Sequence, residues 1–135
     1  MITKLGIAFT LVLAIGLTSY GHHSMQAEFD MSSPITLSGR ITGIEWTNPH
    51  TFLLIATTEA DGKVHEWHVQ GDAPNQLKKL GWSPEMLNTL SKARDTVVIS
   101  GYLSRLNVPH GFQEAWIKDI RLPDGRILPF QRPIS

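Results

Sequence analysis

The chain has 135 residues, no cysteine, and twelve basic against twelve acidic residues, so its formal net charge is zero when histidine is neutral. The missing cysteines exclude a disulfide framework, a thiolate metal site, a cysteine nucleophile and bacterial N-terminal lipidation. The lysines and arginines do not gather into a basic face that could neutralise phosphates, so nucleic acid is not an expected partner.

Residues 1–21 have the three-part pattern of a secretory signal peptide. One positive charge at Lys4 precedes an apolar run from Leu5 to Leu17, and small or polar residues follow up to Gly21. The run is shorter than the roughly 18 to 20 residues that cross a bilayer, so we expect no membrane association after cleavage. The mature protein is therefore expected to be periplasmic or secreted.

The mature part is expected to form one domain. We predict an extended segment over residues 22–34, a β domain over residues 35–130, and a loose tail at residues 131–135. Apolar residues alternate from Ile35 to Trp46 and change phase around Gly43. A phase change at a glycine predicts a long first strand with a bulge or a sharp bend.

Two more strands and a helical connector follow. The β-rich runs Thr51 to Thr58 and Val64 to Val69 flank an Asp61-Gly62 turn, which predicts a hairpin. Asp72 is placed to cap a first short helix, and Ser83 is placed to cap a second.

The last strands are predicted at Thr96–Leu103, Phe112–Leu122 and Ile127–Phe130. Three strands, a helical connector and two more strands match the order of an oligonucleotide/oligosaccharide-binding (OB) barrel. The predicted fold class is mainly β: a small five- to six-stranded OB-like barrel with a short helical connector between strands three and four. A different small barrel or an open sandwich is the alternative.

Six histidines are the concentrated chemical signal, and two of them stand at the predicted mature start. Cleavage after Gly21 would make His22 the first residue, although cleavage after Ser19 also fits the pattern. An N-terminal histidine offers its α-amine and its ring to one metal, and His23 adds a second imidazole. Nitrogen donors favour copper among divalent metals, and Met25 would suit Cu(I). The structural alternative is a polar pair beside a cleavage site.

His50 ends the motif Trp-Thr-Asn-Pro-His in the loop between the first two strands, and His110 lies in the loop between the last two barrel strands. In barrels of this type these loops flank the ligand face, so the two histidines could converge on one site. Alternatively, Asn-Pro builds a turn in which His50 bonds to loop backbone. The candidate metal ligands are His22, His23 and His50, with Met25 and His110 as weaker candidates and copper as the first metal considered.

His65 and His68 lie three residues apart in a predicted strand, which places them on opposite faces. They cannot chelate one metal together. His65 shares its face with Trp67 and is predicted at the edge of the core. His68 shares its face with Glu66 and is predicted to be solvated.

No catalytic constellation is recognisable. The chain has no Gly-x-Ser-x-Gly elbow, phosphate loop, dinucleotide fingerprint or His-Glu-x-x-His motif. Among the acidic residues Glu28, Asp30, Glu45 and Glu66, spacing does not single out an acid/base pair. The sequence therefore predicts a protein without enzymatic turnover.

Several short runs together resemble an exported bacterial family, catalogued as domain of unknown function 6152. They are His22-His23-Ser24, Glu28-Phe29-Asp30, Trp46 to His50, Ala73-Pro74-Asn75, Gly81-Trp82 and Leu122 to Arg126. The resemblance implies a small secreted or periplasmic protein without an assigned activity. The family's recurrent His-His-Ser and Asn-Pro-His motifs correspond here to His22, His23 and His50, while Met25 stands where members more often have an aromatic residue.

Two functional hypotheses follow. The first is a β-barrel binding module that holds copper or another divalent metal through its N-terminal histidines and His50. The alternative is a structural or protein-interaction domain of the cell envelope without metal, whose partner is an unknown envelope protein or a small ligand. An enzyme acting on an envelope substrate ranks below both.

Overall fold

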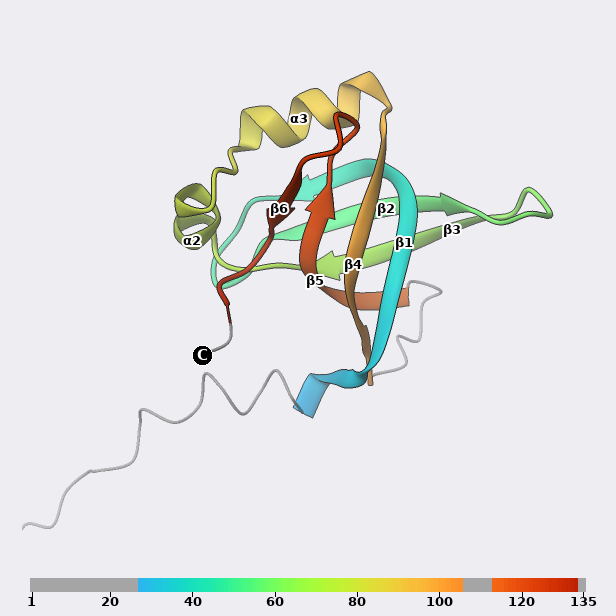
Figure 1. The fold of residues 1–135 in the computed structure, drawn as a ribbon, viewed down its shortest axis with the longest axis horizontal. Helices are drawn as coiled ribbons and strands as arrows, with labels where there is room; N and C mark the ends of the chain where they lie inside the picture. The colour runs from blue at the N-terminus through green and yellow to red at the C-terminus, as the bar shows by residue number, and fades with distance from the viewer. Residues whose placement is uncertain (1–26, 106–112, 134–135) are drawn as a thin grey trace, which may run out of the picture.

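A computed structural model describes residues 27–105 and 113–133 of the chain. The described residues form a closed five-stranded barrel with one added strand and two short helices (Figure 1). The elements in chain order are β1 (Phe29–Glu45), β2 (Phe52–Thr58), β3 (Val64–Gln70), α2 (Pro74–Lys79), α3 (Pro84–Ala93), β4 (Thr96–Ser104), β5 (Gln113–Arg121) and β6 (Ile127–Pro129).

The sheet has the order β3-β2-β1-β4-β5-β6, and its neighbouring strands are antiparallel. The barrel closes where β3 pairs with β5 in parallel, from Trp67 opposite Gln113 to Gln70 opposite Trp116. With both helices between β3 and β4, this is the OB-type strand order. The predicted fold class is therefore confirmed.

The long strand β1 bends enough to belong to both halves of the barrel. Its register against β2 slips between Ile41 and Gly43, at the predicted bulge. A Cβ at Gly43 would lie 2.7 Å from Leu54 Cδ1, so a side chain at this position would have to displace the Leu54 side chain. β1 starts earlier than expected, at Phe29, and its first part pairs with β4, with Pro34 opposite Tyr102.

The helical connector lies on one end of the barrel (Figure 1). Ser83 caps α3 as predicted, and its side chain accepts a hydrogen bond from the backbone N–H of Met86 at 3.1 Å. Asp72 does not cap α2, because the N-cap residue is Ala73, which makes no side-chain cap bond. The Asp72 carboxylate instead accepts hydrogen bonds from Arg132, sixty residues away.

The core fills the barrel and continues beneath the helices. Its fully buried members include Leu53, Ile55, Leu77, Trp82, Leu87, Val97, Ile99, Ile117, Ile120 and Phe130.

Among the described residues, no helix has the length and apolar character needed to cross a membrane.

The chain after β6 is held against the barrel over residues 131–133, where the sequence suggests a loose tail. Gln131 is 8% exposed, and Arg132 donates from its backbone N–H and its Nε to one Asp72 carboxylate oxygen, at 2.9 Å and 3.0 Å. This anchoring becomes important below, because the same segment forms one wall of a pocket.

Candidate functional site

Four side chains gather on the outside of the barrel where β1 ends and β2 begins. Their inward-pointing neighbours Leu53 and Val69 are fully buried in the core, so alternation directs Phe52 and His68 outward. Glu45 lies opposite Phe52 in the β1–β2 ladder, and Glu114 lies opposite His68 in the β3–β5 ladder. We call this set the His68 cluster: Glu45, Phe52, His68 and Glu114.

The His68 ring is the centre of the cluster. It stacks on Phe52 with ring centroids 4.5 Å apart and planes 8° from parallel. His68 Nε2 lies 3.5 Å from Glu45 Oε2, and His68 Nδ1 lies 3.8 Å from Glu114 Oε1. Both distances exceed a normal hydrogen bond, so the contacts are electrostatic in character. The surface therefore presents two carboxylates beside the stacked rings of His68 and Phe52. The His68 side chain is 26% exposed.

The two carboxylates face different nitrogens on different edges of the imidazole. The three groups therefore do not converge on one point. Accordingly, no three acidic or histidine side chains within residues 27–105 and 113–133 are arranged to hold a metal ion. A metal site at this end of the barrel would need ligands from elsewhere in the chain.

His50 lies on the loop that joins two members of the cluster, Glu45 and Phe52. The loop is held against the chain after β3, because Thr51 donates its N–H to the Asp72 carbonyl at 3.1 Å. The His50 carbonyl accepts a hydrogen bond from Thr47 Oγ1 at 3.1 Å. Its half-buried imidazole makes no hydrogen bond to another described residue, so its ring nitrogens are available to a ligand.

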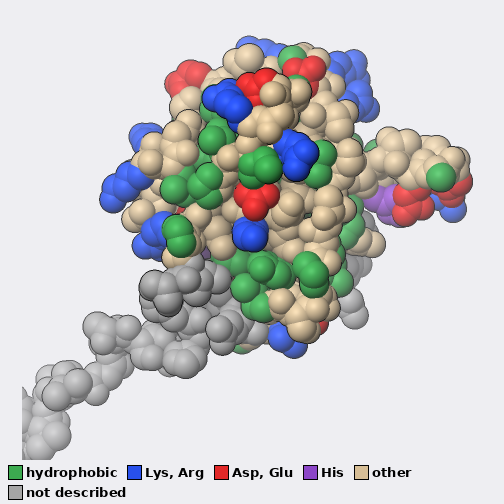
Figure 2. All heavy atoms as spheres, in the orientation of Figure 1, with side chains coloured by type: hydrophobic (Ala, Val, Ile, Leu, Met, Phe, Trp, Pro, Cys, Tyr) green, Lys and Arg blue, Asp and Glu red, His purple; other side chains and the backbone are tan. Residues whose placement is uncertain are grey.

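Charges of both signs alternate with hydrophobic side chains on the face shown in Figure 2. The β2–β3 hairpin projects from the barrel and carries histidine and acidic side chains. Two of these, His65 and Glu59, are in contact, with His65 Nε2 3.3 Å from Glu59 Oε1. This face has no continuous basic surface of the kind that binds a phosphate backbone.

The model of a family of unknown function, DUF6152, matches residues 10–114. The chain belongs to this family. Comparison with curated proteins and with solved structures gave no match. The range matched to DUF6152 includes His50 and every member of the His68 cluster.

Of the predicted ligands in this DUF6152 chain, only His50 is among the described residues. His22, His23, Met25 and His110 lie outside them, so their proximity to His50 stays a prediction. His68, expected to be solvated, is instead partly covered by Phe52. The alternation of side chains along β3 correctly predicts that His68 points outward. It does not predict the neighbouring Glu114, because the parallel pairing of β3 with β5 joins segments far apart in the sequence.

Proposed function

We propose that this chain is an exported binding module, periplasmic or secreted, that holds a divalent metal ion, copper first, through His22, His23 and His50. The observation that carries the proposal is the position of His50. Its imidazole makes no hydrogen bond to a described residue, and its loop connects two members of the His68 cluster. A ligand bound at His50 would thus border a surface that already carries an imidazole and two carboxylates.

The local charge favours a cation. Glu45 and Glu114 bring two carboxylates to the cluster, and carboxylates attract a cation more strongly where part of the solvent is displaced. An N-terminal His22 would supply an α-amine and an imidazole, and His23 would supply another imidazole. Together with His50 this is a nitrogen-rich donor set, which Cu²⁺ binds more tightly than the other divalent first-row metals do. The proposed role involves binding without turnover.

The test begins with the intact mass of the exported protein, which shows whether His22 is its first residue. Titration of that species with Cu²⁺, followed by calorimetry and electron paramagnetic resonance, should then show one equivalent with nitrogen ligation. His50→Ala should weaken binding by about tenfold or more, since even groups that only support a ligand contribute about 10- to 100-fold.

His65→Ala is the matched control. It also removes an imidazole, but Thr57, its partner on β2, lies five residues from Phe52, about 17 Å along the strand. It should leave copper affinity unchanged. A mature chain that lacks His22, or that does not bind copper at micromolar concentration, would refute the metal proposal. The alternative, an envelope interaction domain without metal, would then be pursued by affinity capture.

A further inference from the structure

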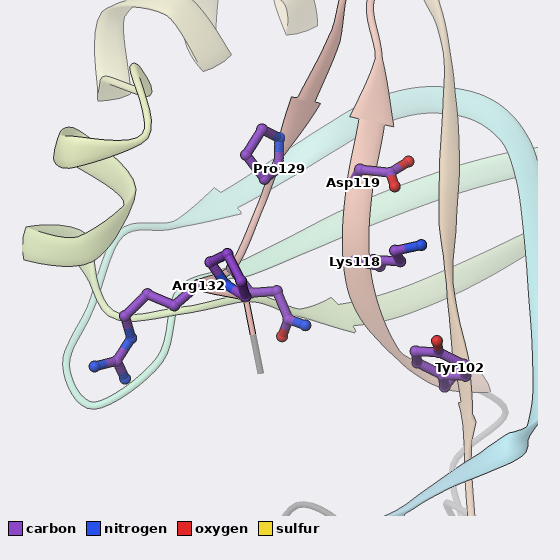
Figure 3. Close-up of a pocket in the computed structure, with 7 residues that line it drawn as sticks. Tyr102, Lys118, Asp119, Pro129 and Arg132 are labelled. Carbon is purple, nitrogen blue, oxygen red and sulfur yellow. The ribbon is translucent and has the colours of Figure 1, made fainter. Parts of the chain in front are cut away.

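A pocket of about 310 Å³ lies on the outside of β5, between β4 and the chain segment that follows β6 (Figure 3). Its volume is at the lower end of the range for small-molecule sites. The side chains important for the argument are Tyr102, Lys118, Asp119, Pro129 and Gln131. None of them belongs to the His68 cluster or to the proposed metal ligands.

A bulge in β5 places two opposite charges at this pocket. Asp119 pairs with Ser100 and Ile117 pairs with Gly101, so Lys118 is an extra residue without a partner in β4. In a regular strand consecutive side chains point to opposite faces, but a bulge changes the direction of one of them. Lys118 and Asp119 therefore extend from β5 toward the same side, as Figure 3 shows.

The pocket wall is fixed before any ligand binds. The Pro129 carbonyl accepts a hydrogen bond from Trp82 Nε1 at 2.8 Å, and the Phe130 N–H donates to the Lys118 carbonyl at 2.9 Å. On the other side, the Tyr102 ring stacks on buried Trp116 with centroids 5.9 Å apart. A wall that is already ordered lowers the entropic cost of binding.

The polar groups of this wall are available to a ligand. Within the described residues, the Lys118 ammonium, the Asp119 carboxylate and the Tyr102 hydroxyl have no hydrogen-bond or ion-pair partner. The same holds for the Gln131 carboxamide, although this side chain belongs to a residue only 8% exposed. Its amide atoms are open to solvent, so a ligand in the pocket can reach them. Arg132 differs, because Asp72 already neutralises its guanidinium.

We infer that this pocket binds a small zwitterion, a free amino acid or a short peptide. Asp119 would bind the ligand's ammonium, Lys118 its carboxylate, and Gln131 would add a hydrogen bond. Tyr102 and Pro129 supply apolar surface for a hydrocarbon side chain. A neutral sugar would satisfy the hydroxyl and the amide but would neutralise neither charge, so the charge pair favours the zwitterion. The inference does not depend on the proposed metal site.

The test uses protein expressed from the full chain and four probes: L-leucine, N-acetyl-L-leucine, L-leucinamide and glucose. Amide chemical shifts are followed by nuclear magnetic resonance during titration. L-Leucine should cause saturable shifts in β5 and residues 129–133. The acetylated probe lacks the ammonium and the amide probe lacks the carboxylate, so each should bind at least about tenfold more weakly than leucine.

Two nearly isosteric substitutions test which residue binds the ammonium of the ligand and which binds its carboxylate. Asp119→Asn should weaken leucine and leucinamide but leave N-acetyl-leucine unchanged, and Lys118→Gln should weaken leucine and N-acetyl-leucine but leave leucinamide unchanged. Arg121→Gln, an exposed change on the same strand outside the pocket, is the control and should change nothing.

The absence of saturable shifts with leucine would overturn the inference. So would glucose binding at the same residues with an affinity that Asp119→Asn does not alter, since the pocket would then select a neutral ligand. Leucine binding should persist in the His50→Ala protein. The two proposals can therefore fail separately.

Discussion

Trp82 joins the helical connector to the pocket wall, and its replacement by phenylalanine gives a quantitative prediction. The indole is 2% exposed, donates to the Pro129 carbonyl at 2.8 Å, and meets the Phe130 ring edge-on at 5.0 Å between centroids. Phenylalanine keeps an aromatic ring in the core but removes the donor. It also leaves a space where the second ring of the indole was.

The lost hydrogen bond accounts for about 1 kcal/mol of unfolding free energy. The space left by the smaller ring costs about 1–2 kcal/mol more, well below the 3–5 kcal/mol of a tryptophan-to-alanine change. We therefore expect Trp82→Phe to destabilise the protein by about 2–3 kcal/mol. For a domain of this size that lowers the melting temperature by roughly 8–12 °C.

Urea unfolding of the variant, followed by circular dichroism, measures the loss. Trp116→Phe is the matched control: Trp116 is also buried, at 3% exposure, and also packs against an aromatic ring, but its indole makes no hydrogen bond to a described residue. It should cost about 1–2 kcal/mol, the packing contribution alone. If the two substitutions cost the same free energy, the indole hydrogen bond contributes nothing and the reasoning is wrong.

Two further predictions concern local hydrogen bonds. Ser83→Ala removes the cap of α3, which leaves the Met86 N–H without its acceptor, and should cost about 1 kcal/mol in urea unfolding, whereas an unchanged midpoint would contradict the capping role. Hydrogen bonds from Ser32 and Ser33 lower the pKa of Asp30 from 3.8 to about 2. A lowered pKa in the folded state stabilises the protein above the unfolded pKa, so the advantage of wild type over Asp30→Asn should be complete above pH 3.8 and disappear as the pH falls through about 2. Thermal melts of both proteins across this range measure the difference, and a difference independent of pH would refute the assignment.

Local patterns were sufficient to predict most of the strands and the start of α3. The phase change at Gly43 marks the bulge of β1, and Ser83 followed by a proline marks the helix start, because each signal depends on a few consecutive residues. The Asp72 prediction was wrong for the opposite reason. A capping aspartate and one that binds a distant arginine look the same in sequence, and Arg132 lies sixty residues away.

The candidate sites were less predictable than the fold. His50 stood out because its motif occupies a loop that flanks the ligand face in OB barrels. The environment of His68 depends on β3 pairing with β5, and the positions of Lys118 and Asp119 depend on a bulge opposite Gly101. Residue types in one strand do not specify either the register or the bulge, because both result from pairing between distant strands.

Strand β5 links the His68 cluster to the pocket and also separates the two electrostatically. Glu114 belongs to the His68 cluster and Lys118 to the pocket, four residues apart on β5, or about 13 Å. Over this separation, which exceeds the Debye length of about 8 Å at physiological ionic strength, a charge at the His68 cluster should hardly change the field at Lys118. At 0.01 M salt the screening length rises to about 30 Å, and copper should then measurably strengthen the binding of an anionic probe such as N-acetyl-leucine. Coupling that appears only at low salt would show that the sites communicate through the field. Coupling that persists at physiological salt would instead be carried by the contacts at Asp72, which accepts hydrogen bonds from Thr51 beside His50 and from Arg132 in the pocket wall.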